Sequence, residues 1–600
     1  MMTRARRKLR LYLRRFGWRL GFSLMLFWAA AAGVLGALAT ILFHYGIYAL
    51  QWLVSGQSGS IVRTIESLPW YGRLLFPVAG GFVAGCLLWL AEKNQSKASS
   101  DYMEAVVIGS GRLSVRQGFL RSLSSLFSVA SGGSIGREGA MVHLGALGAS
   151  ILGRVARFPT DRLRLLVACG SAAGVAAAYG APIAGALFIA EIVLGTMVIQ
   201  SVGPLLVAAA VANFTMRTLG DYQVLYSIGN IVEPVGWQIL VYVLLGLLAG
   251  VVAPLFLKLL NASRQLFRQM GLALPLRLSV GGFLLGLLLT ILPLVAGNGF
   301  SVVSSLLSET WTWHAIIVIL FFKVIATALT VGSGAVGGVF TPTLFVGAAF
   351  GHLFALLMTL IWPELSGATT LFTLVGMGAF LGAATGAPLM AIIMLFEMTL
   401  SYQLVLPLML ACVPAYFVAR TIAEVAMYDV TLSRERDLQF RQNLRYMTLA
   451  KLVRPADTVV VTSSPIKEAA QMFLDYPVKY LYVVDEDNVF QGVISQQDLT
   501  SLLLAKGDLD EQTAGDVVRL DFVQTLYPDM TMDEAQERFA NFTGERLPVV
   551  SRQEKPRLLG VVYKSALLEK YSELKRSVER STESLAELGN DRLWRRPNRR

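Results

Sequence analysis

Long apolar segments fill roughly the first seven tenths of the 600-residue chain, and they restrict its fold more than any other feature. A helix needs about 20 apolar residues to cross the hydrocarbon core of a bilayer, and several segments reach that length. With 54% hydrophobic residues and a mean hydropathy of +0.58, the chain is predicted to be a polytopic α-helical membrane protein. Clear spans are expected near residues 20–48, 70–92, 162–178, 202–216, 237–260, 276–297, 315–331 and 402–419.

Residues 1–20 are strongly basic and contain no acidic side chain. The positive-inside rule therefore predicts a cytoplasmic N-terminus that contacts lipid headgroups. We expect a multi-pass protein of the inner (cytoplasmic) membrane with both termini in the cytoplasm. A nucleic-acid partner is disfavoured because an apolar span follows the basic residues directly. That span is too long for the core of a cleavable signal peptide.

The residue types that build metal and catalytic sites are scattered along the chain. The three cysteines lie in apolar segments without ligand spacing, and the four histidines are isolated from one another. No metal site, no catalytic residue and no required cofactor are expected, so the chain is predicted not to be an enzyme. A phosphate-binding loop of the G-x-x-x-x-G-K type is not present, which disfavours a primary pump.

Two glycine-rich loops interrupt the apolar sequence, each directly before a new helical segment. They run from Gly132 to Ala140 and from Gly332 to Pro342. The first turn of a helix has unpaired N–H groups and partial positive charge, and glycine lets an anion approach the backbone closely. The loops are therefore predicted to be two anion-binding helix ends that face each other inside the membrane. Glu138 stands where an anion would bind.

The chain also contains an internal duplication. Pro182 precedes Glu191 by nine residues (191 − 182), and Pro388 precedes Glu397 by nine residues (397 − 388), after similar small-residue sequences. These copies are offset by 206 residues (388 − 182), and the glycine loops are offset by 201 (337 − 136). Two homologous halves are expected, with a site at their interface near the bilayer midplane.

The composition changes after residue 428, where the sequence becomes charged and short β-branched strands alternate with amphipathic helices. We predict a basic N-terminus at 1–20, a membrane domain at 21–432 with repeats at about 21–219 and 237–432, and a linker at 433–445. A pair of α/β modules at 446–570 and a polar, basic tail at 571–600 complete the domain prediction.

Several motifs occur in a fixed order along the membrane part. They are Gly-Arg-Glu-Gly at 136–139, Lys323-x-x-x-Thr327-x-x-Thr330, Gly-Val-Phe-Thr-Pro at 338–342, Phe-Glu-Met-Thr at 396–399, and Tyr428. Together they resemble the CLC chloride channel and transporter family, and the sequence at 101–105 is most similar to its bacterial ClcB-type branch. The C-terminal modules resemble a CBS-domain pair in the segments 492–498 and 560–566.

The CLC resemblance implies two inverted repeats with broken helices, a homodimer with one pathway per subunit, and transport of chloride or similar monovalent anions. It implies that Glu138 is the gate, because its carboxylate mimics an anion and protonation would free the binding site. An ordinary first-turn acid is the less favoured reading of Glu138. The anion would contact N–H groups and one hydroxyl, from Arg137, Glu138, Gly139, Val339, Phe340 and Tyr428. The serine of the central site is assigned to Ser99 or Ser100, whereas Ser110 is interpreted as part of an ordinary turn.

One departure from the family bears on coupling. Proton-coupled members have a proton-delivering glutamate directly after the position that Glu191 matches, and this chain has Ile192 there. An alkyl side chain carries no proton, so we favour a passive or weakly proton-coupled pathway, with a chloride/proton antiporter as the alternative. Glu191 and Glu397 are interpreted as paired structural carboxylates. A divalent-cation transporter with a CBS tail is the alternative of a different class, and it is disfavoured because oxygen ligands are sparse in the apolar segments.

In the CBS pair, Ser495 and Asp498 have the spacing that holds the ribose of an adenine nucleotide in that family, whereas Ala566 breaks the spacing in the second module. One adenine-nucleotide site that modulates transport is therefore one reading of the pair. A purely structural dimerisation module, with Asp498 capping the helix that follows it, is the other.

Overall fold

A computed structural model of the chain describes residues 2–56, 59–93, 101–107, 109–195, 197–220, 225–226, 236, 238–422, 427–428, 447–504, 512–520, 523–540, 542 and 544–574. The chain divides into a membrane unit, Met1–Leu432, and a C-terminal unit, Ser433–Arg600. The predicted linker at 433–445 and most of the predicted tail, from 575 onward, lie outside the described residues.

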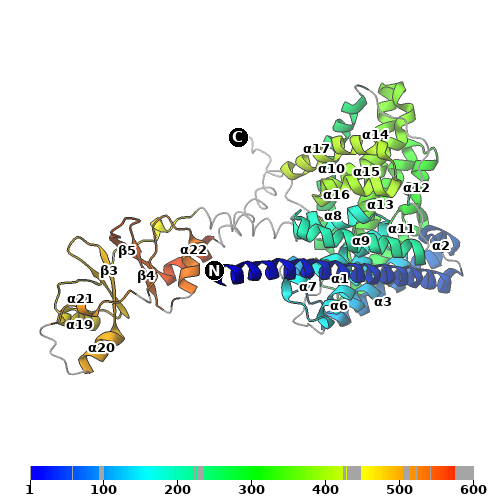
Figure 1. Ribbon diagram of the computed structural model, residues 1–600. Coiled ribbons are helices and arrows are strands. Elements are labelled where there is room, and N and C mark those ends of the chain that lie inside the picture. Colours follow the sequence, from blue (N-terminus) through cyan, green and yellow to red (C-terminus); the bar gives the residue numbers. More distant parts are fainter. Residues whose placement is uncertain are drawn as a thin grey trace, which may run out of the picture. The chain divides into compact units, whose positions relative to one another are not determined.

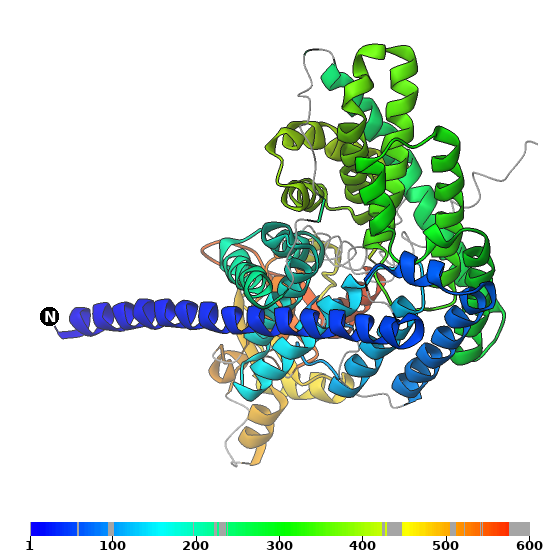
Figure 2. The ribbon, with the colours of Figure 1, turned by 90° about the vertical axis from the view of Figure 1, so that its right-hand side faces the viewer.

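The first half of the membrane unit is a bundle of helices in which short elements separate long ones (Figure 1). It contains α1 (Met2–Ser55), α2 (Ile61–Ser67), α3 (Trp70–Lys93), α4 (Tyr102–Val107), α5 (Val115–Ala130), α6 (Glu138–Val155), α7 (Thr160–Tyr179), α8 (Pro182–Phe188), the π-helical turn η1 (Ile189–Leu194) and α9 (Ile199–Leu219). Helix α1 packs against α6, α7 and α9 and runs along this bundle (Figure 2).

The second half repeats this plan and forms a neighbouring bundle, coloured green to yellow-green in Figure 1. It contains α10 (Gln238–Gln269), α11 (Leu274–Ile291), η2 (Pro293–Val295), α12 (Phe300–Ser308), α13 (Trp313–Gly332), α14 (Phe340–Ile361), η3 (Pro363–Ala368), α15 (Thr369–Thr385), α16 (Pro388–Thr399), η4 (Tyr402–Leu404) and α17 (Val405–Ile422). Helices α8 and α16 contact each other where the bundles meet.

Among the described residues, eight helices are long and apolar enough to cross a membrane. The expected span at 162–178 is wrong as a clear span, because small residues and the arginines at 162 and 164 lower the hydropathy of α7, which is mostly buried inside the unit. Conversely, α14 belongs to the eight although the sequence did not single it out. Several of the remaining helices are short, as expected for segments that line protein instead of lipid.

The packing of α3 on α11 supports the inverted arrangement of the two halves. A side chain at Gly81 would collide with the carbonyl of Leu278, and one at Gly282 would collide with the carbonyl of Pro77. Residue numbers rise along one helix while they fall along the other, so these two matching helices run antiparallel. Small residues at the contact let the backbones approach closely. The predicted fold class, inverted repeats with broken helices followed by an α/β pair, is confirmed by the elements and by the solved relatives described below.

The C-terminal unit contains two similar α/β modules. The first consists of η5 (Leu449–Lys451), β1 (Val459–Val461), α19 (Ile466–Asp475), β2 (Tyr480–Val484), β3 (Phe490–Ser495) and α20 (Gln496–Leu504), and the second of α21 (Ala514–Val517), α22 (Met532–Ala540), β4 (Arg546–Val550) and β5 (Leu558–Tyr563). Strand β1 pairs parallel to β2, which pairs antiparallel to β3, and β4 pairs antiparallel to β5. Gly492 and Gly560 occupy matching places with φ of 150° and 151°, so the modules share one local backbone.

Candidate functional site

The two glycine loops meet in the membrane unit, as the sequence predicted. The N–H of Gly136 donates to the carbonyl of Gly338 (2.7 Å), and the N–H of Gly338 donates to the carbonyl of Gly136 (2.9 Å). Helix α6 begins at Glu138 and α14 begins at Phe340, so both helix starts lie directly after this bridge. The bridge thus brings together two electropositive helix ends that are about 200 residues apart in the sequence.

The carboxylate of Glu138 lies at this junction and is held from the other half of the chain. The backbone N–H of Thr341 donates to Oε1 (3.2 Å), and the Thr341 hydroxyl donates to Oε2 (3.2 Å). Since the Thr341 hydrogen is used in that bond, the Tyr179 hydroxyl, 3.0 Å from Thr341 Oγ1, donates to the threonine. Glu138 is only 7% exposed, so these contacts and not bulk water surround its carboxylate.

The same carboxylate explains two of the glycines. A Cβ added at Gly136 or at Gly338 would occupy the position of the Glu138 carboxyl group. Neither glycine has the positive φ that would by itself disfavour a side chain. Space is therefore the reason for glycine at both positions, and a methyl group at either would displace the Glu138 side chain.

Glu138 lies between two hollows in the membrane unit. The larger has a volume of about 520 Å³, and the smaller, about 20 Å³, is large enough for one water molecule. Glu138 and Tyr179 line both hollows. The smaller one is otherwise lined by residues that include Arg137, Tyr226, Asn298 and Thr341.

The structure groups most of the predicted anion contacts in the larger hollow. Gly139, Val339, Phe340 and Tyr428 line it together with Glu138, whereas Arg137 lines only the smaller one. The ring of Phe188, from α8, lies 5.6 Å from that of Tyr428 and 6.2 Å from that of Phe340 (centroid distances). The predicted serines Ser99 and Ser100 lie outside the described residues. Ser110 is exposed and lies between bends at 109 and 111, and its interpretation as part of an ordinary turn stays a prediction.

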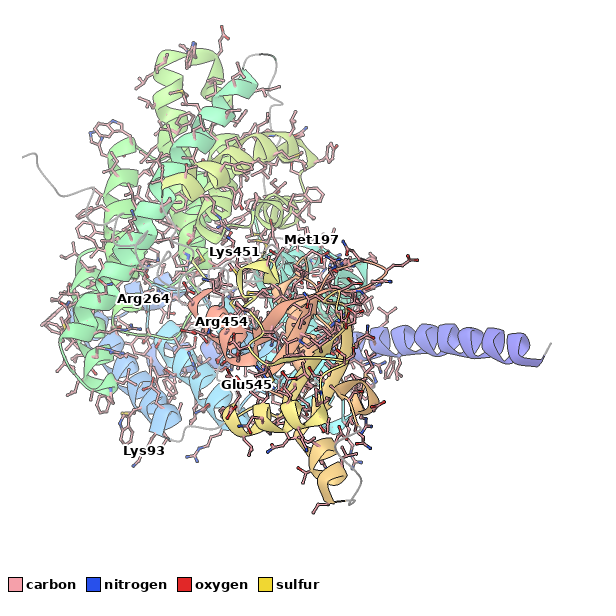
Figure 3. The ribbon with its side chains drawn as sticks, turned by 90° about the vertical axis from the view of Figure 1, so that its left-hand side faces the viewer. Lys93, Met197, Arg264, Lys451, Arg454 and Glu545 are labelled. Atoms are coloured by element: carbon pink, nitrogen blue, oxygen red, sulfur yellow. The ribbon has the colours of Figure 1, made fainter. Side chains whose placement is uncertain are left out.

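The larger hollow is also lined by six further charged side chains. Four are arginines, Arg121, Arg264, Arg268 and Arg277, and two are acids, Glu92 and Asp101. Arg264 is labelled on α10 in Figure 3. An excess of positive charge in a hollow with low-dielectric walls raises the local concentration of anions. Within the described ranges no group of three His, Cys, Asp or Glu side chains could hold a metal ion.

Glu191 and Glu397 form reciprocal caps between the halves. The Glu397 carboxylate accepts the N–H groups of Ile183 (3.0 Å) and Ala184 (2.8 Å) at the start of α8. The Glu191 carboxylate accepts those at the start of α16, from residue 389 (3.4 Å) and from residue 390 (2.9 Å). Each acid thus satisfies orphan N–H groups in the opposite half, which confirms their interpretation as paired structural carboxylates.

Ile192 is 1% exposed and lies in η1, packed in the apolar core of the membrane unit. Its side chain offers neither a carboxylate nor a polar atom at this position. The position at which the sequence analysis expected the proton-delivering group to be missing thus holds a buried alkyl side chain.

In the C-terminal unit, Ser495 and Asp498 contact each other. The Ser495 hydroxyl donates to Asp498 Oδ2 (2.5 Å), and the N–H of Asp498 donates back to Ser495 Oγ (3.0 Å). Asp498 Oδ1 also pairs with Arg519 (3.1 Å). The serine therefore caps α20, and both side chains have protein partners. The adenine-nucleotide site stays a prediction, and a nucleotide would replace these contacts.

Two residues of the site were not singled out by sequence reasoning, Thr341 and Tyr179. Thr341 stands inside the motif at 338–342, and Tyr179 interrupts the alanine and glycine run three residues before Pro182. A polar side chain within an apolar segment was the signal in the sequence that could have identified each of them. Their contact with Glu138 and with each other depends on how the two halves pack.

Comparison with known proteins places this geometry in a family. The family model described as voltage gated chloride channel matches residues 79–420, and the CBS domain model matches residues 451–505 and 514–573. The putative chloride channel protein ClcB-like of Ralstonia nicotianae is 48% identical over 418 residues, which are 69% of this chain and 97% of the relative. The voltage-gated ClC-type chloride channel ClcB of Salmonella typhimurium is 41% identical over 406 residues, 67% of this chain and 97% of the relative.

Solved structures show the same fold. A slow cyanobacterial Cl−/H+ antiporter superposes with a TM-score of 0.59 at 24% identity, covering 68% of this chain and 97% of its own. A eukaryotic CLC transporter superposes with a TM-score of 0.56 at 18% identity, covering 90% of this chain and 97% of its own.

Proposed function

Since the chain belongs to the voltage-gated chloride channel (CLC) family, a family of anion transporters, we propose that it forms a passive or weakly proton-coupled pathway for chloride or similar monovalent anions, gated by Glu138. The relatives named as chloride channels support chloride as the substrate. The membrane unit would carry the anion, and the CBS pair would modulate it.

The position of Glu138 between the two hollows carries this proposal. A carboxylate there closes the connection, held by the two donors of Thr341 next to the helix starts at which the anion would bind. Protonation removes the negative charge that makes those hydrogen bonds strong, so the side chain leaves and an anion replaces it. Flux is therefore expected to rise as the pH falls.

The anion would bind in the larger hollow between the loop backbone and an aromatic wall. The helix starts supply N–H groups at Gly139, Val339 and Phe340, and Tyr428 supplies a hydroxyl. Such dipoles offset part of the cost of dehydrating the anion without holding it as tightly as a lysine would. Arg137 would act from the smaller hollow, by its charge. The arginines that line the larger hollow would concentrate anions there.

The side chain of Ile192 supports the passive or weakly coupled form of the proposal, because it leaves the usual proton position without a carboxylate. Glu191 is a poor substitute, since its carboxylate is already bonded to the start of α16. A chloride/proton antiporter that takes its proton by another route is the alternative. We also propose a homodimer in the inner membrane with both termini in the cytoplasm, supported by the basic N-terminus and the family.

The test is the reversal potential of the purified full chain in liposomes, measured under a chloride gradient and an opposing proton gradient. A reversal at the chloride potential supports a passive pathway. A reversal displaced toward the proton gradient supports the antiporter. Glu138→Ala is the control for the gate, because it should carry anions without a pH response. Metal-dependent uptake with no anion flux would overturn the proposal.

A further inference from the structure

The motif Lys323-x-x-x-Thr327-x-x-Thr330 has no part in the function proposed above. The spacings of four and three residues place these side chains on one face of α13. All three are buried, Lys323 completely. Each is connected, directly or through one turn of the chain, to the loop at 132–136 that precedes Glu138 in the opposite half. The face formed by Lys323, Thr327 and Thr330 is called the α13 clamp below.

Two hydroxyls of the clamp hold Ser134. The Ser134 hydroxyl shares a hydrogen bond with that of Thr327 (3.0 Å), and the Ser134 N–H donates to Thr330 Oγ1 (3.2 Å). The hydroxyl of Thr330 in turn donates to the carbonyl of Ala326, one turn earlier in α13 (2.8 Å). Both the side chain and the main chain of Ser134 are thus fixed by one helix, four residues before Glu138.

Lys323 acts on the start of the same loop. Its ammonium group donates to the carbonyls of Val295 (2.9 Å) and Gly297 (2.6 Å) and lies 5.6 Å from the centre of the Phe345 ring. The N–H of Gly297 then donates to the carbonyl of Gly132 (3.1 Å). A buried amino group is costly unless its hydrogen bonds are made, so the two bonds from Lys323 hold this turn in place.

The duplication of the chain supplies an internal comparison. Gly132 and Gly334 begin matching loop backbones with φ of 96° and 97°, which sets an offset of 202 residues (334 − 132). With this offset, Lys323, Thr327 and Thr330 of α13 match residues of α5. The matching residues are Arg121, Ser125 and Ser128, so the motif is present twice.

The hydroxyls of the two copies differ in what they hold. Among the described residues, the hydroxyls of Ser125 and Ser128 have no hydrogen-bond partner. The residue that matches Ser134 is Val336, which has no hydroxyl for α5 to hold. The engaged copy is the one that acts on the loop with the glutamate.

We infer that the α13 clamp positions the gate: Lys323, Thr327 and Thr330 fix the loop at 132–136 so that the Glu138 carboxylate reaches the donors of Thr341. This inference rests on the proposed gating by Glu138. The clamp residues are positioning residues, since they act through the loop and do not touch the anion site. Releasing the loop weakens the closed position of the deprotonated gate, so the pathway opens at higher pH.

The test compares the removal of a serine hydroxyl at two different positions. Ser134→Ala and Ser125→Ala each remove one hydroxyl from a serine that is 0% exposed, but only the Ser134 hydroxyl has a partner. Chloride flux in liposomes is measured from acidic to neutral pH. At a fixed pH on the slope of the flux profile, Ser134→Ala should raise the flux about fivefold, which corresponds to the net contribution of one hydrogen bond. It should also shift the midpoint of the profile to higher pH. Ser125→Ala should leave the profile unchanged.

Thr327 provides the second line of evidence and guards against misfolding. Thr327→Val should shift the profile as Ser134→Ala does, the double variant should shift it no further, and Thr327→Ser should restore the original profile. The charged and titratable groups around the gate stay unchanged in every variant. They include Arg137 beside it, Tyr179 from α7, Tyr226, Tyr428, and His44 from α1 near Arg137, as well as Asp101 and His143 in the larger hollow and Lys323 of the clamp.

Equal pH profiles for Ser134→Ala and Ser125→Ala would overturn the clamp. Midpoint shifts that follow only the thermal stability of the variants would also overturn it. Glu138→Gln separates this failure from failure of the proposed function. If Glu138→Gln abolishes the pH response while Ser134→Ala and Thr327→Val leave it intact, only the clamp is wrong. If Glu138→Gln keeps the original pH response, the gate assignment itself is wrong.

Discussion

Replacing Thr341 by valine tests the gate through its donor and leaves Glu138 in place. Valine has nearly the shape of threonine, so the substitution removes the hydroxyl that donates to Glu138 Oε2 and keeps the N–H that donates to Oε1. Both residues are buried, and the smaller hollow beside them has room for about one water molecule, which makes a weaker donor to the carboxylate than a fixed hydroxyl. Thr341→Val should therefore weaken the closed, deprotonated gate.

The magnitude follows from the type of bond. A hydrogen bond to a charged group contributes about 1.5–3 kcal/mol, and a separation of 3.2 Å between the oxygens points to the lower end. About 1.4 kcal/mol corresponds to a factor of ten in the ratio of open to closed gates. The pH midpoint of chloride flux should consequently move up by about one unit, with up to about tenfold more flux at neutral pH.

The assay is chloride efflux from liposomes across a series of pH values, with the full chain. Tyr179→Phe is the matched variant, because it removes the hydroxyl that donates to Thr341 but keeps the bond from Thr341 to Glu138. It should shift the midpoint in the same direction and by less. A midpoint that moves to lower pH in Thr341→Val, or one that moves equally in both variants, would refute the reasoning.

Four further predictions follow from the same contacts. In the same efflux assay, the flux through Glu138→Gln at neutral pH should match that of the wild type at acidic pH, and little pH response should remain. Gly338→Ala should also flatten the pH response, because the new methyl group takes the place of the carboxylate, although no titratable group is changed. Glu397→Gln should lower the thermal unfolding temperature in detergent, because an N–H group at the start of α8 loses its acceptor at a cost of about 1–3 kcal/mol. As a control, Glu364→Gln changes an exposed side chain and should leave the unfolding temperature unchanged. Tyr428→Phe should weaken anion binding about fivefold by isothermal titration, the contribution of one hydroxyl donor, while keeping the ring.

Local patterns in the sequence predicted a large part of the fold and of the candidate site. Glycine clusters before apolar helices predicted two helix starts, and the structure places them at Glu138 and Phe340. The proline-to-glutamate spacing predicted two related halves, and Glu191 and Glu397 indeed make equivalent bonds. These features are readable because helix starts, spans and repeats depend on residues that are close together in the chain.

The partners across the two halves were not readable. Glu138 and Thr341 are 203 residues apart, and so their contact depends on how the inverted bundles pack, not on any local pattern. The sequence reading likewise placed α7 among the clear spans and passed over α14, whereas the length and hydropathy of the helices seen in the structure favour α14 over α7. The motif beginning at Lys323 was visible as a string of residues, but its role was not.

By itself, then, the sequence determined the membrane class, the doubled architecture and the acid at the centre of the candidate site. Only the tertiary structure decided which donors hold Glu138, which half supplies each cap, and which hydroxyls hold Ser134. The physical reason is that hydrogen bonds between the halves require positions accurate to a few tenths of an ångström. Such positions result from the packing of both halves together, so no single segment encodes them.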